Sequence, residues 1–132
     1  MILFYRVLAI LFYPVIILLT FCRVFLGKED PKRYKEKIFS SHFNIKRNKD
    51  RKLIWIHAAS IGELKSIIPI VLKLNDNDQE KDFLITTSTF SSSKIADSEF
   101  KNLKNVSHRF FPFDVGFLIN KFLKLWDPNF IF

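Results

Sequence analysis

The hydrophobic pattern divides the chain into an apolar start, a polar middle and a regularly alternating remainder. Residues 1–22 are almost continuously apolar and contain one charge, Arg6. A helix of this length reaches about 33 Å, enough to cross the ~30 Å hydrocarbon core of a bilayer. Residues 27–52 are polar and charged, and apolar runs resume at Leu53. The pattern predicts a membrane-anchor helix over 1–26, a basic juxtamembrane connector over 27–52 and a folded domain over 53–132.

From Leu53 onward, short apolar runs alternate with segments of helical periodicity. Strands are expected at Leu53–Ala58, Phe83–Thr87, Val106–Phe113 and Phe130–Phe132, and helices at Ile61–Leu74, Ser91–Leu103 and Phe117–Trp126. The inward face of the first helix is expected to hold Leu64, Ile67, Ile68, Val71 and Leu74. Pro69 within it predicts either a kink or a short first segment. The β-α-β-α-β-α-β order predicts an α/β, Rossmann-like domain with a right-handed, parallel, doubly wound sheet.

The apolar start has two alternatives to an uncleaved spanning anchor, namely a cleaved signal peptide and a helix lying in the membrane interface. A signal peptide is disfavoured because no small-x-small cleavage site follows residue 22. Basic residues crowd the region after the anchor: Arg23, Lys28, Lys32, Arg33, Lys35 and Lys37. The positive-inside rule therefore predicts that the rest of the chain lies in the cytoplasm.

Composition adds a strong positive charge to this picture. The 132 residues carry a formal net charge of +8, which indicates anionic partners such as anionic lipid, a phosphorylated substrate or nucleic acid. A second basic cluster ends the connector: Lys46, Arg47, Lys49, Arg51 and Lys52. It is either a solvated linker or a belt held against lipid headgroups. Nucleic acid is disfavoured as a partner because no recognisable binding motif is present. The single cysteine, Cys22, excludes an internal disulfide and a cysteine-based metal cluster.

The candidate chemistry lies where the strands end, because ligands of open α/β sheets bind outside the carboxyl ends of the strands. The segments expected there are residues 59–63, 86–89 and 112–114. Glu63 falls in the first helical turn, where the helix dipole favours a carboxylate that can accept a proton from a substrate hydroxyl. The alternative is a helix-capping glutamate without chemistry, and Ser60 has the same alternative as an N-cap. Gly62 permits close approach of a ligand to the backbone.

His57 lies within the first predicted strand, where a histidine is more often a hydrogen-bonded core residue than a ligand. No cluster of metal ligands is apparent in the sequence, so no metal site is expected.

The stretch HAASIGELKSIIPIV (57–71) resembles the first strand–helix unit of the 3-deoxy-D-manno-octulosonic acid (Kdo) transferases. Two further segments match the same family in order. LITTSTFSSSKIA (84–96) is similar to its second strand and T-T-x-T loop. HRFFPFDVGFLINKFLKLWDPNFIF (108–132) is similar to its third strand, a Pro-x-Asp turn and a helix ending in W-x-P. The apolar anchor and basic segment are also typical of the family.

The resemblance implies a glycosyltransferase of the two-domain GT-B fold, of which residues 53–132 are part of the N-terminal, acceptor-side domain. Such enzymes transfer Kdo from CMP-Kdo to the phosphorylated lipid A precursor, in lipopolysaccharide synthesis at the cytoplasmic face of the bacterial inner membrane. The general base carries over to Glu63, and substrate-binding roles to Ser60, Gly62, Thr87 and Asp114. The transfer implied needs no metal or other cofactor.

The sequence departs from the family in length, because family members are much longer and bind CMP-Kdo in a C-terminal domain. The sequence is therefore expected to be the front part of a truncated or split transferase that is inactive alone, with a separately encoded C-terminal half as a further expected partner. The alternative is a non-catalytic remnant or a membrane-anchored lipid-binding module.

Overall fold

The structure, a computed structural model, describes residues 2–43, 47–78 and 80–132, so Lys46 of the basic cluster lies outside the described residues. Along the chain the elements are α1 (Ile2–Phe25), α2 (Lys35–Ile38), η1 (Ser40–His42), β1 (Leu53–Ala58), α3 (Ile61–Asn77), β2 (Asp82–Thr87), α4 (Phe90–Phe100), β3 (Val106–Phe110), α5 (Gly116–Trp126) and β4 (Phe130–Ile131). They fall into a helical unit (Met1–Ile45 and Pro112–Trp126) and a sheet unit (Lys46–Phe111 and Asp127–Phe132).

In the sheet unit, four parallel strands pair in the order β3-β2-β1-β4, which confirms the predicted α/β fold. β1 is central and aligns Ala58 with Thr87 at the end of β2. β3 ends at Phe110, so the prediction of a strand to Phe113 was wrong. The Phe111 N–H still bonds the Thr87 carbonyl at 2.9 Å. Pro112 has no N–H with which to continue the ladder.

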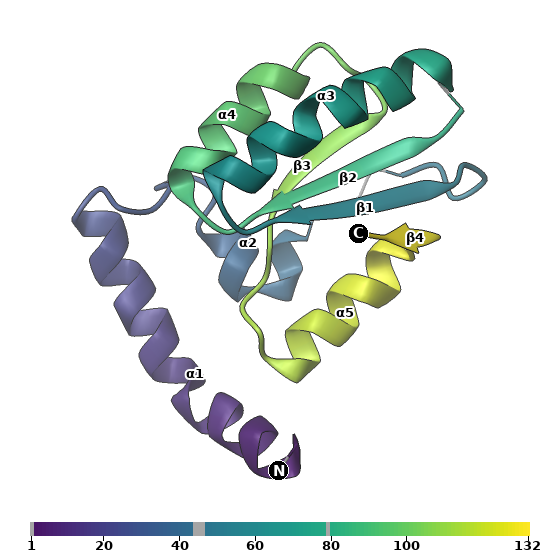
Figure 1. The fold of residues 1–132 in the computed structure, drawn as a ribbon. Helices are drawn as coiled ribbons and strands as arrows, with labels where there is room; N and C mark the ends of the chain where they lie inside the picture. The colour runs from purple at the N-terminus through teal and green to yellow at the C-terminus, as the bar shows by residue number, and fades with distance from the viewer. Residues whose placement is uncertain (1, 44–46, 79) are drawn as a thin grey trace. The chain divides into compact units, whose positions relative to one another are not determined.

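Helices α3 and α4 cover one face of the sheet (Figure 1). Leu64 and Val71 of α3 pack there on the apolar side chains of β1 and β2, whereas Leu74, predicted to face inward, is exposed. Leu74 borders an open apolar groove of about 460 Å³ that Phe130 and Phe132 also line. Since no described residue fills this groove, the last turns of α3 lack the cover that the periodicity predicted.

Pro69 leaves α3 in one continuous helix from Ile61 to Asn77, three residues longer than predicted. Proline removes only one backbone hydrogen bond, and Pro69 lies on the exposed side of the helix. The helix after β2 ends earlier than predicted, because α4 ends at Phe100 and leaves Leu103 outside it.

The helical unit has a small aromatic core of its own. One face of α5 buries Leu118, Phe122 and Trp126, the spacing expected for adjacent turns. Phe43, which follows η1, packs edge-on against Phe122 with ring centroids 5.3 Å apart.

The connector predicted over 27–52 contains folded structure in its first half. Glu29 and Lys37 are both buried and form an ion pair with 2.6 Å between Oε2 and Nζ. The other oxygen of Glu29 accepts from Arg23 Nε at 3.1 Å. Glu36 is buried as well and pairs with Arg33. Three of the six cations counted after the apolar segment therefore have carboxylate partners in the helical unit and cannot all face lipid headgroups.

The core position of Leu64 and the exposed position of Ile70 on the same helix define a stability test. We expect Leu64→Ala to lower the free energy of unfolding by about 2–5 kcal/mol, because it leaves a cavity between α3 and the sheet. Ile70→Ala is the matched control and should change it by no more than about 0.5 kcal/mol. Urea denaturation of the detergent-solubilised chain, followed by circular dichroism, measures both. Equal losses from the two substitutions would contradict the described packing of α3.

Candidate functional site

The turn between β1 and α3 holds Glu63 by reciprocal capping. Ser60 is the N-cap residue of α3, and its Oγ accepts from the Glu63 N–H at 3.2 Å. In return, Glu63 Oε2 accepts from the Ala59 N–H at 2.8 Å. This is close to a capping box, in which a serine and a glutamate three residues later satisfy backbone donors at a helix start. The N-cap interpretation of Ser60 is therefore confirmed, and Glu63 does act as a cap.

Capping uses only one of the two carboxylate oxygens. Glu63 is exposed, and no described residue hydrogen bonds to its Oε1. The side chain is thus held in one direction at the carboxyl end of the central strand, with an acceptor oxygen left for a ligand. The positive end of the α3 dipole attracts negatively charged groups at this position. A helix cap and a proton acceptor are therefore compatible here.

His57 lies beside this turn on the sheet face opposite α3. Its Nδ1 is 3.0 Å from Thr86 Oγ1, which also accepts from Trp55 Nε1 at 2.9 Å. The ring of Phe111 packs on His57 with centroids 4.5 Å apart. Burial lowers the pKa of His57, and hydrogen bonding to Thr86 and the charge of Glu63 oppose this only in part. His57 is therefore a hydrogen-bonded, largely neutral neighbour of Glu63 at pH 7.

Thr87 is buried at the end of β2 and forms part of a three-residue hydrogen-bond chain. Its Oγ1 is 2.9 Å from His108 Nε2, and His108 Nδ1 is 3.0 Å from Asp97 Oδ1. The chain links β2, β3 and α4. The Thr87 side chain is fully buried, so it can contribute to a site only by supporting the loop that follows. In that loop Thr89 caps α4, because its Oγ1 accepts from the Ser92 N–H.

Gly62 is not required by packing within the sheet unit. A Cβ at this position would meet Ser60 Oγ at 3.9 Å, an ordinary contact, and the backbone has no positive φ. A glycine in a helix costs about 0.5–1 kcal/mol relative to alanine. The open surface above Gly62 is therefore available to a ligand.

Asp114 belongs to the helical unit, whereas the four other predicted site residues belong to the sheet unit. It is exposed just before α5 and accepts a hydrogen bond from the Tyr5 hydroxyl at 2.8 Å. Ser60, Gly62 and Glu63 lie together in one turn, and the β1–β2 register brings Thr87 opposite Ala58. The sequence thus predicted four neighbours within the sheet unit.

Asp97 and His108 were not predicted as supporting residues, and Ala59 and Thr86 were predicted only as members of the segments at the strand ends. A capping box is visible in the sequence as Ser60-x-x-Glu63, which indicates the reciprocal bonds of that turn. No local pattern pairs His108 with Thr87 or His57 with Thr86, because these residues meet only through the sheet register.

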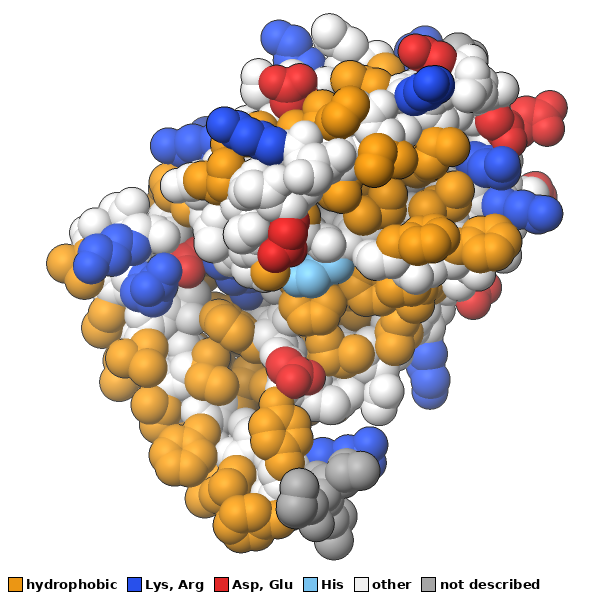
Figure 2. All heavy atoms as spheres, in the orientation of Figure 1, with side chains coloured by type: hydrophobic (Ala, Val, Ile, Leu, Met, Phe, Trp, Pro, Cys, Tyr) orange, Lys and Arg blue, Asp and Glu red, His pale blue; other side chains and the backbone are white. Residues whose placement is uncertain are grey.

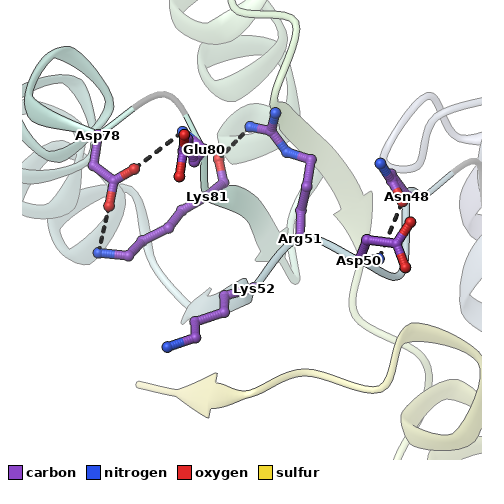
Figure 3. Close-up of a pocket in the computed structure, with 7 residues that line it drawn as sticks. All are labelled: Asn48, Asp50, Arg51, Lys52, Asp78, Glu80 and Lys81. Atoms are coloured by element: carbon purple, nitrogen blue, oxygen red, sulfur yellow. Dashed lines mark hydrogen bonds and ion pairs between the residues drawn. The ribbon is translucent and has the colours of Figure 1, made fainter.

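A second concavity, of about 670 Å³, lies at the opposite, amino ends of β1 and β2 (Figure 3). Its size would suit a ligand. Part of its charge is already paired: Lys81 pairs with Asp78 at 2.7 Å, and Arg51 with Asp82 of β2 at 2.8 Å. The acidic and basic groups alternate without converging on one point, so we assign no function to it. Across the described residues, no three His, Cys, Asp or Glu side chains gather as metal ligands.

The sheet unit is thus a parallel α/β domain with an oriented carboxylate at its first strand–helix turn. A family model described as 3-deoxy-D-manno-octulosonic-acid transferase (Kdo transferase) matches residues 32–132. The chain belongs to this family.

Relatives of the same description cover nearly all of the chain. The 3-deoxy-D-manno-octulosonic acid transferase of Rickettsia bellii is 34% identical over 126 residues, which are 95% of this chain and 29% of the relative. The enzyme of Rickettsia prowazekii is 26% identical, over 98% of this chain and 36% of its own length. A probable mitochondrial enzyme of Arabidopsis thaliana is 35% identical over 58% of this chain and 17% of its own length. The chain spans about a third of the Rickettsia relatives, and no solved structure matches it.

Two substitutions of Glu63 separate its role as a helix cap from its proposed role as a proton acceptor. Glu63→Ala removes the acceptor for the Ala59 N–H and should lower the free energy of unfolding by about 1 kcal/mol. Glu63→Gln keeps a carbonyl oxygen for this bond, so the loss should stay below about 0.5 kcal/mol. Lys65→Ala, an exposed change in the same helical turn, is the control. Urea denaturation of the three variants tests this, and a glutamine variant as unstable as the alanine variant would contradict the cap described.

Proposed function

We propose that the chain is the acceptor-side, base-carrying part of a Kdo transferase. In this proposal Kdo passes from CMP-Kdo to a hydroxyl of the lipid A precursor, and the reaction takes place at the cytoplasmic face of the bacterial inner membrane. Membership of the family supports the reaction class. The observation that carries the role of this chain is the exposed Glu63 carboxylate, held through Oε2 with Oε1 unoccupied by any described residue.

The step assigned to Glu63 is proton removal from the acceptor hydroxyl. The oxygen attacks the anomeric carbon of Kdo while the bond from that carbon to the CMP phosphate breaks, so CMP leaves with the electron pair. The proton moves to Glu63 Oε1. A base is needed because a sugar hydroxyl is a weak nucleophile, and positioned general bases are worth about 10²–10⁴-fold in rate.

Ser60, Gly62, Thr87 and Asp114 are proposed to serve acceptor binding in different ways. Ser60 positions Glu63 through its capping bond. Gly62 leaves space for the acceptor beside the turn, and Thr87 supports the neighbouring loop from within the sheet. Asp114 is proposed as a polar contact on the acceptor side, through the oxygen that does not accept from Tyr5. The excess of basic side chains suits a phosphorylated acceptor and an anionic membrane.

The donor site is proposed to lie outside these residues. The relatives are about three times as long as the segment matched here, which supports a second part that binds CMP-Kdo and is supplied by another region or a separate chain. The exposed apolar side chains of α1 favour a second candidate function, a membrane-bound lipid-binding module without transferase activity. The two are distinguished by joining this chain to the region of the Rickettsia bellii enzyme that follows its matched segment.

In that chimaera, Glu63→Gln should lower the turnover number by about 10²–10⁴-fold while the Michaelis constant for the acceptor changes little, because the amide keeps the cap but cannot take a proton. Initial rates of Kdo transfer to a lipid A precursor measure both constants. The 132-residue chain alone is the control and should not transfer Kdo. A normal turnover number with a raised Michaelis constant would instead make Glu63 a binding group, and an inactive parent chimaera would favour the lipid-binding module.

Gly62→Ala should weaken acceptor binding without destabilising the fold. The added methyl group meets no close contact in the sheet unit, so the variant should be as stable as the parent or more stable by up to about 1 kcal/mol. It should nevertheless raise the Michaelis constant for the acceptor, because the methyl group occupies the space proposed for it. Ser66→Ala, one helical turn further along, is the control. Unchanged acceptor kinetics in Gly62→Ala would place the acceptor elsewhere.

A further inference from the structure

Helix α1 contacts the rest of the helical unit through side chains near its start, its middle and its end. Near its start, the Tyr5 hydroxyl donates to Asp114 Oδ2 at 2.8 Å. Halfway along, the Tyr13 hydroxyl donates to the Ile38 carbonyl, and the Tyr13 ring packs edge-on against Phe117 with centroids 5.4 Å apart. Near its end, Phe21 packs on Tyr34. These contacts place two tyrosine hydroxyls, eight residues apart, on the inner face of the helix.

The remaining surface of α1 is apolar and uncovered. Its large exposed side chains are Phe4, Val7, Ile10, Leu11, Phe12, Val15, Leu18, Leu19 and Phe25. Together they are called the apolar strip of α1, and Figure 2 shows hydrophobic side chains gathered along this helix. An exposed apolar surface of this extent requires a partner, and its composition matches lipid acyl chains. The segment Phe4–Phe25 is also long and apolar enough to cross a bilayer by length and composition alone.

A spanning arrangement conflicts with the contacts of the inner face. Tyr5 and Phe21 are 16 positions apart, which corresponds to about 24 Å of helix, most of a hydrocarbon core. If α1 crossed the bilayer, Tyr5 would lie near the far surface, while Asp114 and Tyr34 belong to the same folded unit. Tyr13 would lie near the bilayer centre and lose the Ile38 carbonyl, and an unpaired hydroxyl in hydrocarbon is costly.

We infer that α1 lies in the plane of the membrane interface, with its apolar strip among the acyl chains and the helical unit on its other side. Isolated interfacial helices carry their own charged face. Here the polar side is supplied by α2, α5 and the segments beside them, through Asp114 and the Ile38 carbonyl. Exposed basic residues at both ends, Arg6, Lys28 and Lys32, can reach anionic headgroups. The partner is thus the surface of an anionic bilayer, and the inference does not depend on the transferase reaction.

Cross-linking between Tyr5 and Asp114 tests this arrangement in the full chain. In a Cys22→Ser background, Tyr5→Cys with Asp114→Cys should be joined by a short bismaleimide in native membranes. Leu11→Cys with Asp114→Cys, which pairs the outer face of α1 with the same residue, should not be joined. Absence of the first cross-link while both cysteines are accessible to maleimide would overturn the inference.

A second measurement leaves the inner contacts intact. Arg6→Cys, again with Cys22→Ser, places one exposed thiol near the start of α1, at the level of the lipid headgroups. A membrane-impermeant maleimide should modify it in inverted inner-membrane vesicles but not in intact spheroplasts. Labelling in spheroplasts would show that α1 crosses the bilayer, and loss of the residue by cleavage would show a signal peptide. Either result would overturn the inference.

Discussion

The parallel register around β1 is the constraint on which the candidate site depends. β1 lies between β2 and β4. Its buried backbone N–H and C=O groups must find hydrogen-bond partners on these two strands, which fixes the register of the pairing. Because parallel strands end at the same edge, this alignment brings the turn after Ala58 beside Thr87. The apolar residues behind the sheet, on α3 and α4, then hold both turns at that edge. The position of Glu63 is therefore a consequence of core packing.

At this edge, one side chain combines a structural and a chemical role. Glu63 satisfies the Ala59 N–H, a donor that the end of β1 leaves unpaired, and in doing so it is held in one orientation. A free carboxylate would lose rotamer entropy on binding a substrate, whereas a carboxylate held by a cap has already lost it. The hydrogen bond between His57 and Thr86 restricts the motion of the neighbouring side chains on the sheet. The structural interpretation of Glu63 and the catalytic proposal thus support one another.

In the helical unit, buried charge decides how the chain leaves α1. Glu29 and Lys37 form a buried ion pair. Burying either one without the other would leave an uncompensated charge, so the two must be buried together. Their pairing, with Arg23 on the other oxygen of Glu29, folds the start of the connector against the end of α1. This fixes the direction from which α2 approaches the helix, and with it the contact of Tyr13 with the Ile38 carbonyl. The membrane arrangement inferred for α1 follows from this local geometry.

The sequence alone determined the features that depend on neighbouring residues. Apolar runs located the four strands, helical spacing located α3 and α5, and Ser60-x-x-Glu63 indicated the cap, because strand alternation, helical periodicity and capping all act within a few residues. The motif around residues 57–63 also indicated the family.

Only the tertiary structure decided the features that join distant residues. It ended β3 before Pro112, left Leu74 at an open groove, buried the Thr87 hydroxyl against His108, and paired Tyr5 with Asp114, 109 residues away. Each outcome depends on which side chains the folded chain brings together, and a local pattern contains no information about a partner that far along the sequence.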